Sequence, residues 1–417
     1  MWDVLIAGGG ASGLAAACAL SPDLSVLLLE KQKRVGRKLL ATGNGRCNLS
    51  NARMDASHYQ GGGTALEEVL SARPPAGIAG FFRDLGLMVR TDEEGRMYPR
   101  SNQAASVLDA LRFTAQERGC EFRTECEAVH IRPVKGGLRT QTRSGEAFIS
   151  RCVLLCMGGP AGPALGGCAD GLKLLRELGH RVVPARPALA PLCVPPESVR
   201  SLKGQRLECC LRLTVDGSEV RAEDGEVLFG DGTLSGIAAM DLAERAGRAL
   251  RDGRSCQVRL AILRQSPEEV QRLLRSLAEE HPERGLEDFL TGITGKRAGM
   301  EIVKRAGLDL SAPAASLTAA DTRGLAGLLT DWPFTVTGVK GFENAQVSAG
   351  GAMLEDFDST LASRIVPGLF AAGEVLDVCG DCGGYNLHWA WASALTASEG
   401  IRRSLRKGRN ENDRLSL

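Results

Sequence analysis

The chain has 417 residues, of which 43% are hydrophobic, and a formal net charge of +1. A chain of this length is too long for one simple core, so we expect a globular protein of two or three domains. The near-zero net charge gives no electrostatic argument for binding nucleic acid or an anionic membrane. No apolar run reaches the roughly 18 residues of a membrane span. We therefore expect neither a nucleic acid nor a membrane as a partner.

The cysteines and histidines indicate a reduced protein without a metal site. There are 13 cysteines scattered through apolar segments, whereas disulfide frameworks are typical of short secreted chains. The 5 histidines show no metal-ligand spacing, so no metal is predicted. The first predicted strand begins at Asp3, and we therefore expect no signal peptide and a cytoplasmic location.

The first thirty residues predict a dinucleotide-binding unit. Residues 3–7 form a short apolar run typical of a buried strand, and a glycine-rich turn follows at 8–13. Residues 14–20 are helical in pattern, and a second apolar strand, 25–29, ends in Glu30. Strand, glycine turn, helix, strand and acid in this order are the context that a GxGxxG motif needs.

Each glycine of the motif has a physical task in such a unit. Gly8 permits the tight turn, Gly10 lets a pyrophosphate approach the backbone, and Gly13 lets the helix pack close to the strand. The helix N-terminus offers free N–H groups and the positive end of its dipole to the phosphates. Glu30 can accept hydrogen bonds from an adenosine ribose and disfavours a 2′-phosphate there. A glycine turn without a ligand is the alternative, and the complete context argues against it.

A basic, glycine-containing loop follows at 36–51. Glycine and asparagine suit turns whose backbone N–H groups face a ligand. A solvated surface loop is the alternative. We favour contact with the cofactor, because the loop emerges beside the position that Glu30 marks.

The GRK and GNGRCN elements of this loop resemble the BaiN/YhiN-like family of FAD-dependent flavoproteins, which includes proteins called aminoacetone oxidases. The stretches AGEVLDV, GGYNL and WAWASA near the C-terminus match the same family, so the resemblance spans nearly the whole chain. It implies FAD as the bound dinucleotide. It also implies an α/β fold with a discontinuous, glutathione-reductase-like Rossmann FAD-binding domain and two inserted regions.

The patterns along the chain predict where these regions lie. Prolines crowd the stretch from Pro184 to Pro196, and short strands alternate with turns after it. A capping box at Ser266 and a second helix start at Thr318 indicate helices. We expect the following parts: an FAD-binding domain at 1–183 and 340–417, an inserted β-rich substrate domain at 184–263 and 331–339, and a small helical insert at 264–330.

The remaining residues of the expected FAD-binding segment 1–183 predict a helix and a β meander. Ser101 is a candidate N-cap for a helix that contains Val107 and Leu111. The expected strands of the meander are 126–131, 138–142 and 147–149, and the meander closes on a strand at 152–156, which ends before Gly158 and Gly159. Many FAD proteins have Ala-Thr-Gly-Gly at this position, and the two glycines that permit close approach of the flavin are kept here.

The C-terminal part completes the expected site. A buried strand ends at Gly373-Glu374, and a helix begins at Gly383-Gly384. In FAD proteins of this type the acid binds ribityl hydroxyls, and the helix N-terminus stabilises negative charge at the flavin edge. The two ends of the chain therefore form one FAD site.

The residues that we expect to contact the cofactor lie in the glycine turns, the basic loop, one meander strand and the two C-terminal motifs: Gly8, Gly10, Ala11, Ser12, Gly13, Glu30, Lys31, Gly36, Arg37, Lys38, Gly43, Gly45, Arg46, Cys47, Asn48, Val129, Gly158, Gly159, Gly373, Glu374, Gly384, Tyr385, Asn386 and Leu387.

Three side chains are candidates for catalysis. Reduction of a polarised double bond needs a hydride from flavin N5 and a proton for the other carbon. Tyr385 is the favoured proton donor. His388 stands where the family usually has Gln, but the helix dipole would lower its pKa and weaken it as an acid. Arg46 or solvent is the remaining source.

Our main hypothesis is a reductase that takes hydride from NAD(P)H and reduces an activated C=C bond of a small, steroid-like or bile-acid-like acceptor. Only one dinucleotide motif is found, so NAD(P)H is expected as a transient donor. An FAD-dependent amine oxidase that uses oxygen is the alternative, and a non-catalytic flavin-binding redox sensor ranks third. We expect a monomer or a homodimer. Cys379 and Cys382 have CxxC spacing, and an ordinary turn is favoured over a redox dithiol.

Overall fold

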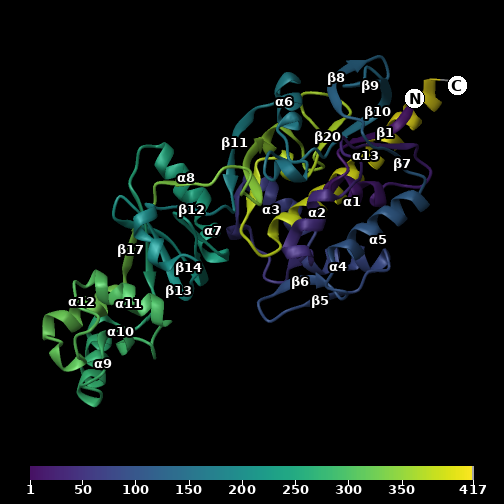
Figure 1. The fold of residues 1–417 in the computed structure, drawn as a ribbon. Coiled ribbons are helices and arrows are strands. Elements are labelled where there is room, and N and C mark those ends of the chain that lie inside the picture. The colour runs from purple at the N-terminus through teal and green to yellow at the C-terminus, as the bar shows by residue number, and fades with distance from the viewer. Residues whose placement is uncertain (416–417) are drawn as a thin grey trace. The chain divides into compact units, whose positions relative to one another are not determined.

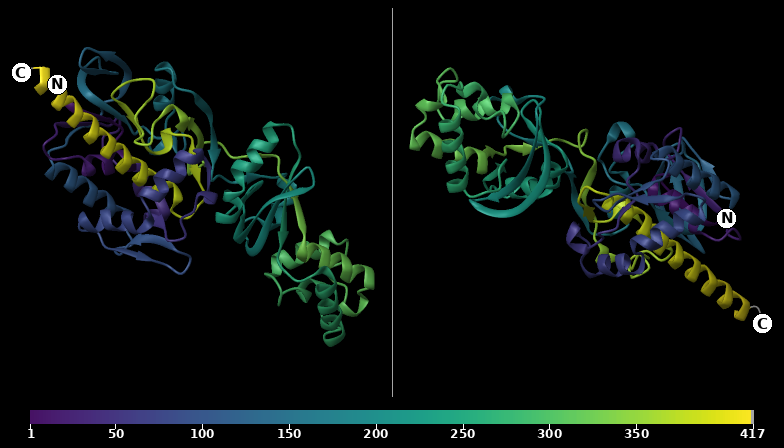
Figure 2. Two further views of the ribbon diagram at one scale, coloured as in Figure 1. Left: turned by 180° about the vertical axis from the view of Figure 1, so that it is seen from behind. Right: turned by 90° about the horizontal axis from the view of Figure 1, so that it is seen from below.

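The computed structural model describes residues 1–415, and the chain forms two compact units (Figures 1 and 2). Unit 1 comprises Met1–Arg186 and the chain from Gln346 onward, and unit 2 is the continuous segment Pro187–Ala345. Each unit has its own hydrophobic core. The further division of the inserted segment into a β-rich and a helical domain stays a prediction.

Unit 1 is built on a seven-stranded sheet that begins with the predicted strand–turn–helix–strand. Strand β1 (Trp2–Ala7) leads into helix α1 (Ala11–Ala19) and strand β2 (Val26–Leu29). All four residues of β2 are buried, as expected for an apolar strand covered on both faces. The sheet order is β7 (Glu121–Arg123), β2, β1, β10 (Ala147–Leu155), β9 (Gly137–Thr142) and β8 (Ala128–Val134). Strand β20 (Leu369–Ala371) also pairs with β10.

The parallel pairing within this sheet determines where a ligand can bind. Strand β1 runs parallel to both β2 and β10, and β20 runs parallel to β10. The carboxyl ends of these strands therefore meet at one edge of the sheet, which is where open α/β sheets bind ligands. The glycines at 8–13 and 158–159 and the acids Glu30 and Glu374 follow these strand ends.

Three helices pack together in unit 1. Helix α13 (Tyr385–Leu415) lies along α1, and α5 (Ala104–Glu117) also contacts α1 (Figure 1). The predicted cap at Ser101 is wrong, because α5 starts after Gln103 and the Ser101 hydroxyl donates instead to Ser106 Oγ at 2.8 Å. The sequence pattern located the helix but not its first turn.

The meander has fewer strands than the sequence predicts. Strands β8 (Ala128–Val134) and β9 (Gly137–Thr142) form a hairpin that continues into β10. The two predicted last strands are one, since β10 pairs antiparallel with β9 along its first half and parallel with β20 along its second. A strand that changes partners half-way reads in the sequence as two short runs.

The remaining elements of unit 1 are short. Its other helices and strands are α2 (Arg37–Ala41), α3 (Gly63–Ala72), α4 (Pro75–Asp84), α6 (Asp170–Glu177), β3 (Ser50–Asn51), β4 (Tyr59–Gly61), β5 (Val89–Thr91), β6 (Arg96–Pro99), β7 (Glu121–Arg123), β19 (Val347–Ala352) and β21 (Val378–Gly380), with β11 (Val182–Ala188) at its border. β21 pairs with β4, and β3, β6 and β5 form a three-stranded sheet.

Unit 2 contains an antiparallel sheet in the order β17-β16-β13-β14-β15-β12-β18, and the helices between residues 267 and 330 gather at one end of it (Figure 1). Its elements are β12 (Leu192–Cys193), β13 (Arg206–Val215), β14 (Ser218–Phe229), β15 (Thr233–Ser235), α7 (Ile237–Asp241), α8 (Ala243–Arg251), β16 (Cys256–Ala261), α9 (Pro267–Glu280), α10 (Leu286–Phe289), α11 (Lys296–Arg305), α12 (Ala319–Thr330), β17 (Trp332–Thr335) and β18 (Gly338–Val339). The helices and the sheet share one buried cluster.

Both predicted helix starts in unit 2 are confirmed. Ser266 and Glu269 form a reciprocal capping box at α9, and Thr318 and Asp321 form one at α12. None of the helices in the described part of the chain combines the length and the apolar character that a membrane span needs.

Candidate cofactor site

Packing alone requires two of the glycines after β1. Gly8 has φ +107°, and its N–H donates to the Leu29 carbonyl at 2.8 Å. A Cβ on Gly8 would lie 2.3 Å from the Cys156 carbonyl oxygen, and a Cβ on Gly13 would lie 1.9 Å from the Gly8 carbonyl oxygen. No side chain fits at either position, so β1, β10 and α1 approach each other as closely as backbones allow.

Gly10 differs, because it faces open space. A Cβ on this residue would meet no atom within 4 Å. It is the N-cap of α1, which has no side-chain cap and no acid in its first turn. The first N–H groups of the helix are therefore available to an anion, as the pyrophosphate of a dinucleotide requires.

Glu30 is fixed at the end of β2 by two backbone donors. Its Oε2 accepts from the Gly9 N–H at 2.8 Å and its Oε1 from the Gln32 N–H at 2.7 Å. Each carboxylate oxygen has a second lone pair. The side chain can thus still accept hydrogen bonds from ribose hydroxyls while its position is held.

A pocket at this edge of the sheet brings together many of the predicted residues, all of them in unit 1. Those that line it are Gly8, Gly10, Ala11, Ser12, Glu30, Lys31, Gly36, Arg37, Lys38, Gly158, Gly159, Glu374, Asn386 and Leu387. Other predicted residues lie outside its lining: Gly13, Gly43, Gly45, Arg46, Cys47, Asn48, Val129, Gly373, Gly384 and Tyr385.

The pocket also contains residues that the sequence analysis did not assign. Among them are Cys126, Glu127, Ala128, Met157, Leu165, Gly166, Gly167, Cys168, Val347 and Trp389. Ala128 lines the pocket where Val129 was predicted, and successive strand residues point to opposite faces. If the residues of this strand had been assigned to the correct faces, Ala128 would have been predicted in place of Val129. The glycine-rich run that includes Gly166 and Gly167 was noticeable in the sequence, but it has no motif order.

Glu374 forms the opposite wall together with a lysine from α2. Its Oε2 lies 2.9 Å from Lys38 Nζ, and its Oε1 accepts from the Ser348 N–H at 2.8 Å. A Cβ on Gly159 would lie 2.8 Å from Glu374 Oε1, so glycine is needed for this approach. The predicted acid thus lies at the carboxyl end of β20, beside the glycines that follow β10.

The basic loop adopts an unusual backbone that explains its composition. Gly43, Asn44, Gly45 and Cys47 all have positive φ values, between 54° and 82°. Cys47 is fully buried, and burial raises the pKa of its thiol to about 12, so it stays protonated. The Arg46 guanidinium lies over the Tyr98 ring at 5.1 Å. Arg46 is therefore engaged with an aromatic ring rather than with the pocket.

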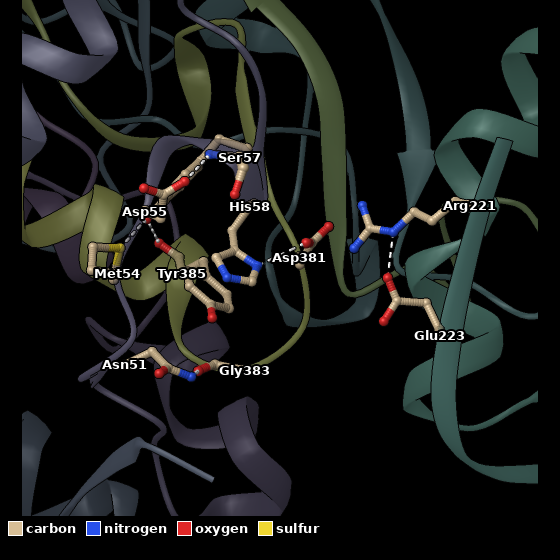
Figure 3. Close-up of polar contacts among 12 residues, drawn as sticks. Asn51, Met54, Asp55, Ser57, His58, Arg221, Glu223, Asp381, Gly383 and Tyr385 are labelled. Atoms are coloured by element: carbon tan, nitrogen blue, oxygen red, sulfur yellow. Dashed lines mark hydrogen bonds and ion pairs between the residues drawn. The ribbon is translucent and has the colours of Figure 1, made fainter. Parts of the chain in front are cut away.

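The N-terminal turn of α13 forms another wall of the pocket. The Asn386 amide donates to the Gly380 carbonyl at 2.7 Å and its oxygen accepts from the Gly380 N–H at 2.9 Å. Tyr385 is buried and stacks on His58, with ring centroids 4.2 Å apart and an interplanar angle of 19° (Figure 3). The helix start is therefore held firmly beside the site.

His388 lies outside the lining of the pocket. Its side chain is fully buried, and its Nδ1 lies 2.8 Å from Ser50 Oγ. Burial lowers its pKa to about 4, so it is neutral at pH 7. Sequence reasoning anticipated a lowered pKa but attributed it to the helix dipole. We drop His388 as a proton donor.

Two other predictions concern cysteines and metals. Cys379 and Cys382 are thiols in the structure, and Cys379 is buried on β21. Within residues 1–415, no three His, Cys, Asp or Glu side chains gather so that they could hold a metal ion.

The residues present fit a dinucleotide. Gly10 leaves space where a phosphate would pass, α1 offers uncapped N–H groups, and Glu30 supplies an acceptor at the end of the next strand. Comparison with known protein families shows which family has this arrangement. Residues 2–400 match the family described as the HI0933-like protein Rossmann domain. The chain belongs to this family.

Proteins of known name resemble the chain over almost its full length. A 3-dehydro-bile acid delta(4,6)-reductase from Clostridium scindens is 35% identical over 399 residues, which cover 94% of this chain and 97% of the relative. A ribosomal RNA dihydrouridine synthase from Escherichia coli is 27% identical over 419 residues, covering 96% and 98%. The predicted family is confirmed.

A solved structure supports the fold. The 3-ketosteroid delta1-dehydrogenase of Sterolibacterium denitrificans, in complex with 1,4-androstadiene-3,17-dione, superposes with a TM-score of 0.54 and 14% identity. The match covers 97% of this chain and 99% of that protein. At this identity the likeness concerns the fold. This HI0933-like protein is a flavoprotein oxidoreductase with the Rossmann-like FAD-binding fold, and the predicted α/β class is confirmed.

Proposed function

We propose that this protein is an FAD-dependent reductase that takes hydride from NAD(P)H and saturates a C=C bond conjugated to a carbonyl group. The observation that carries the proposal is the chemistry shared by the names of two relatives. One is named for reducing the delta-4,6 bonds of a 3-dehydro-bile acid. The other is named for making dihydrouridine, in which the C5–C6 double bond of uracil is saturated. In both, a carbonyl polarises the reduced bond.

The chain's own residues would bind and orient the cofactor. The first turn of α1 and the open face of Gly10 would hold the pyrophosphate, and Glu30 would accept from the adenosine ribose. Glu374, which pairs with Lys38, would accept hydrogen bonds from the hydroxyls of the ribityl chain. FAD, when bound, supplies the hydride chemistry that no side chain here offers.

The N-terminal turn of α13 would stabilise negative charge at the pocket wall. Asn386 and Leu387 line the pocket in the first turn of this helix, where the positive end of the helix dipole favours a negative charge. Such an environment stabilises electron-rich groups at the pocket wall.

A small steroid-like enone is the proposed acceptor, because the relative with that substrate is the more similar of the two, at 35% against 27% identity. A uridine within RNA is the second candidate, because the dihydrouridine synthase also matches along 96% of this chain. This candidate stands against the expectation from net charge that no nucleic acid is bound.

The proposal is tested by anaerobic half-reactions on the FAD-loaded protein. We expect NADH or NADPH alone to bleach the flavin, and a 3-oxo-4,6-diene steroid to restore its colour with formation of the saturated product by mass spectrometry. Unmodified ribosomal RNA, assayed in parallel for dihydrouridine, tests the second acceptor. Aminoacetone is the matched probe for the oxidase alternative. Bleaching by the amine but by neither nicotinamide would overturn the proposal.

A further inference from the structure

A histidine that sequence reasoning passed over lies beside the cofactor pocket. His58 Nδ1 is 3.2 Å from Asp381 Oδ2, and the His58 ring stacks on Tyr385 (Figure 3). We refer to His58, Asp381 and Tyr385 as the histidine cluster. Neither His58 nor Asp381 is among the residues that the sequence predicted for the cofactor site.

The backbone of unit 1 builds this cluster from segments that are far apart in the sequence. His58 ends a short 3₁₀ turn, Ala56–His58, which Asp55 caps by accepting from the Ser57 N–H at 2.8 Å. The Asp381 N–H donates to the His58 carbonyl at 2.9 Å, and the adjoining strands β4 and β21 are paired. Backbone and side chain thus both join His58 to Asp381.

Further contacts fix Tyr385 and the loop before it. The Tyr59 hydroxyl donates to the Tyr385 carbonyl at 2.8 Å, and the Tyr59 ring meets the Tyr385 ring edge-on at 5.9 Å. The Asn51 amide donates to the Gly383 carbonyl at 3.0 Å. The stacked rings are therefore held from several sides and form a rigid arrangement.

The cluster adjoins the pocket through the same elements. Val378 on β21 and Asn386 on α13 line the pocket, and the Asn386 amide also donates to the Asp381 carbonyl at 3.3 Å. The segment that carries Asp381 thus borders the pocket wall, and His58, Asp381 and Tyr385 themselves lie outside the pocket lining.

A buried carboxylate next to an imidazole has a defined chemical effect. The Asp381 side chain is 8% exposed, and that of His58 is 36% exposed. When Nδ1–H of an imidazole donates to a carboxylate, the tautomer is fixed, and the exchangeable proton of the charged ring is carried by Nε2. Because Nδ1 faces Asp381, the other ring nitrogen, Nε2, is directed away from the carboxylate.

We infer that His58, oriented by Asp381, donates the proton that completes acceptor reduction. The inference rests on the proposed function. A hydride, carrying two electrons, joins the carbon remote from the carbonyl, and the proton of His58 Nε2 joins the carbon next to it. The π bond breaks, two C–H bonds form, and the neutral imidazole recovers its proton from solvent. Tyr385 holds the ring in place by stacking.

Kinetics of His58→Gln provide the first test. We expect the acceptor half-reaction to slow by about 10²-fold or more, the size typical of a lost general acid. Flavin reduction by NAD(P)H and flavin reoxidation by ferricyanide, which needs no proton on carbon, should keep wild-type rates. The wild-type acceptor rate should fall as pH rises, and this dependence should vanish in the variant. His281→Gln, at an exposed histidine of unit 2, is the matched control.

Nitrogen NMR of the histidine rings provides the second test, and it needs no bound FAD. We expect neutral His58 to carry its proton on Nδ1 in the wild type and to lose this preference in Asp381→Asn. A wild-type ring protonated on Nε2 would overturn the inference.

The two proposals fail in distinguishable ways. If the wild type reduces neither enone nor uridine, the proposed function is wrong and this inference is overturned with it. If the wild type reduces an acceptor and His58→Gln does so at the same rate and with the same pH profile, only the inference is overturned.

Discussion

His388 shows how burial can decide the chemistry of a single side chain. It lies in the first turn of α13, and the sequence analysis kept it as a candidate for catalysis although this position would weaken it as an acid. In the structure the ring is fully buried with Nδ1 against Ser50 Oγ, and burial lowers its pKa to about 4. A ring that stays neutral at pH 7 is suited to packing rather than to proton donation.

The lowered pKa of His388 predicts a pH dependence of stability. In the unfolded chain the ring has its ordinary value of about 6.5, so below that pH the unfolded state binds a proton that the folded state does not. Stability therefore falls as the pH drops from about 6.5 towards 4. We expect the free energy of unfolding of the wild type to decrease by about 2 kcal/mol more between pH 7 and pH 5 than that of His388→Gln.

Urea unfolding at the two pH values measures this difference, and His281→Gln controls for loss of an exposed histidine. Gln can keep a hydrogen bond to Ser50 but cannot ionise. Parallel loss of stability in wild type and His388→Gln would show that the buried ring does not set the acid sensitivity.

At the scale of elements, the turn between β1 and α1 contains one glycine that serves ligand binding and another that serves packing. A Cβ on Gly10 meets nothing within 4 Å, whereas one on Gly13 would lie 1.9 Å from the Gly8 carbonyl. We expect Gly10→Val to fold with a near-normal melting temperature and to lose most of its FAD. Gly13→Val should instead destabilise unit 1 by at least about 3 kcal/mol, because the helix must move off the strand.

Absorbance of the purified flavoprotein and thermal unfolding of both variants measure the two effects. Full FAD occupancy in a folded Gly10→Val protein would place the pyrophosphate elsewhere. A melting temperature of Gly13→Val equal to that of the wild type would refute the packing argument.

The elements that sequence patterns predicted well are those whose signals are local. The glycine turn, the Glu30 strand end and both capping boxes depend on residues within one or two turns of each other. The continuity of β10 was missed because it depends on which strands pair with it, and pairing is a long-range property. The start of α5 was missed because Ser101 found another partner.

The site was predicted in outline for the same reason. Motif glycines and Glu374 could be assigned, since their roles follow from strand ends that meet at one sheet edge. Arg46 and Val129 could not be placed, because a cation over an aromatic ring and the facing of one strand residue depend on tertiary packing. His58 and Asp381 are more than three hundred residues apart, and no pattern in the sequence joins them.

At the scale of the whole molecule, two hydrophobic cores occur in one chain. Unit 1 is interrupted by the whole of unit 2, and the residues that line the cofactor pocket all belong to unit 1. Interruption of a domain is tolerated where the inserted segment has a core that it can form by itself. The FAD-binding edge of unit 1 therefore depends on segments from both ends of the chain.

Each unit has its own core, and the cofactor pocket lies in unit 1. We therefore expect two unfolding transitions. Added FAD should raise only the transition of unit 1, by about 2.7 kcal/mol of stability at one hundred times its dissociation constant. Leu154→Ala in the core of unit 1 should lower that same transition, and Leu260→Ala in the core of unit 2 should lower the other, each by about 2–5 kcal/mol, because both side chains are fully buried. Differential scanning calorimetry with and without FAD measures this assignment. A single transition that FAD and both substitutions shift together would show that the two cores unfold as one cooperative unit.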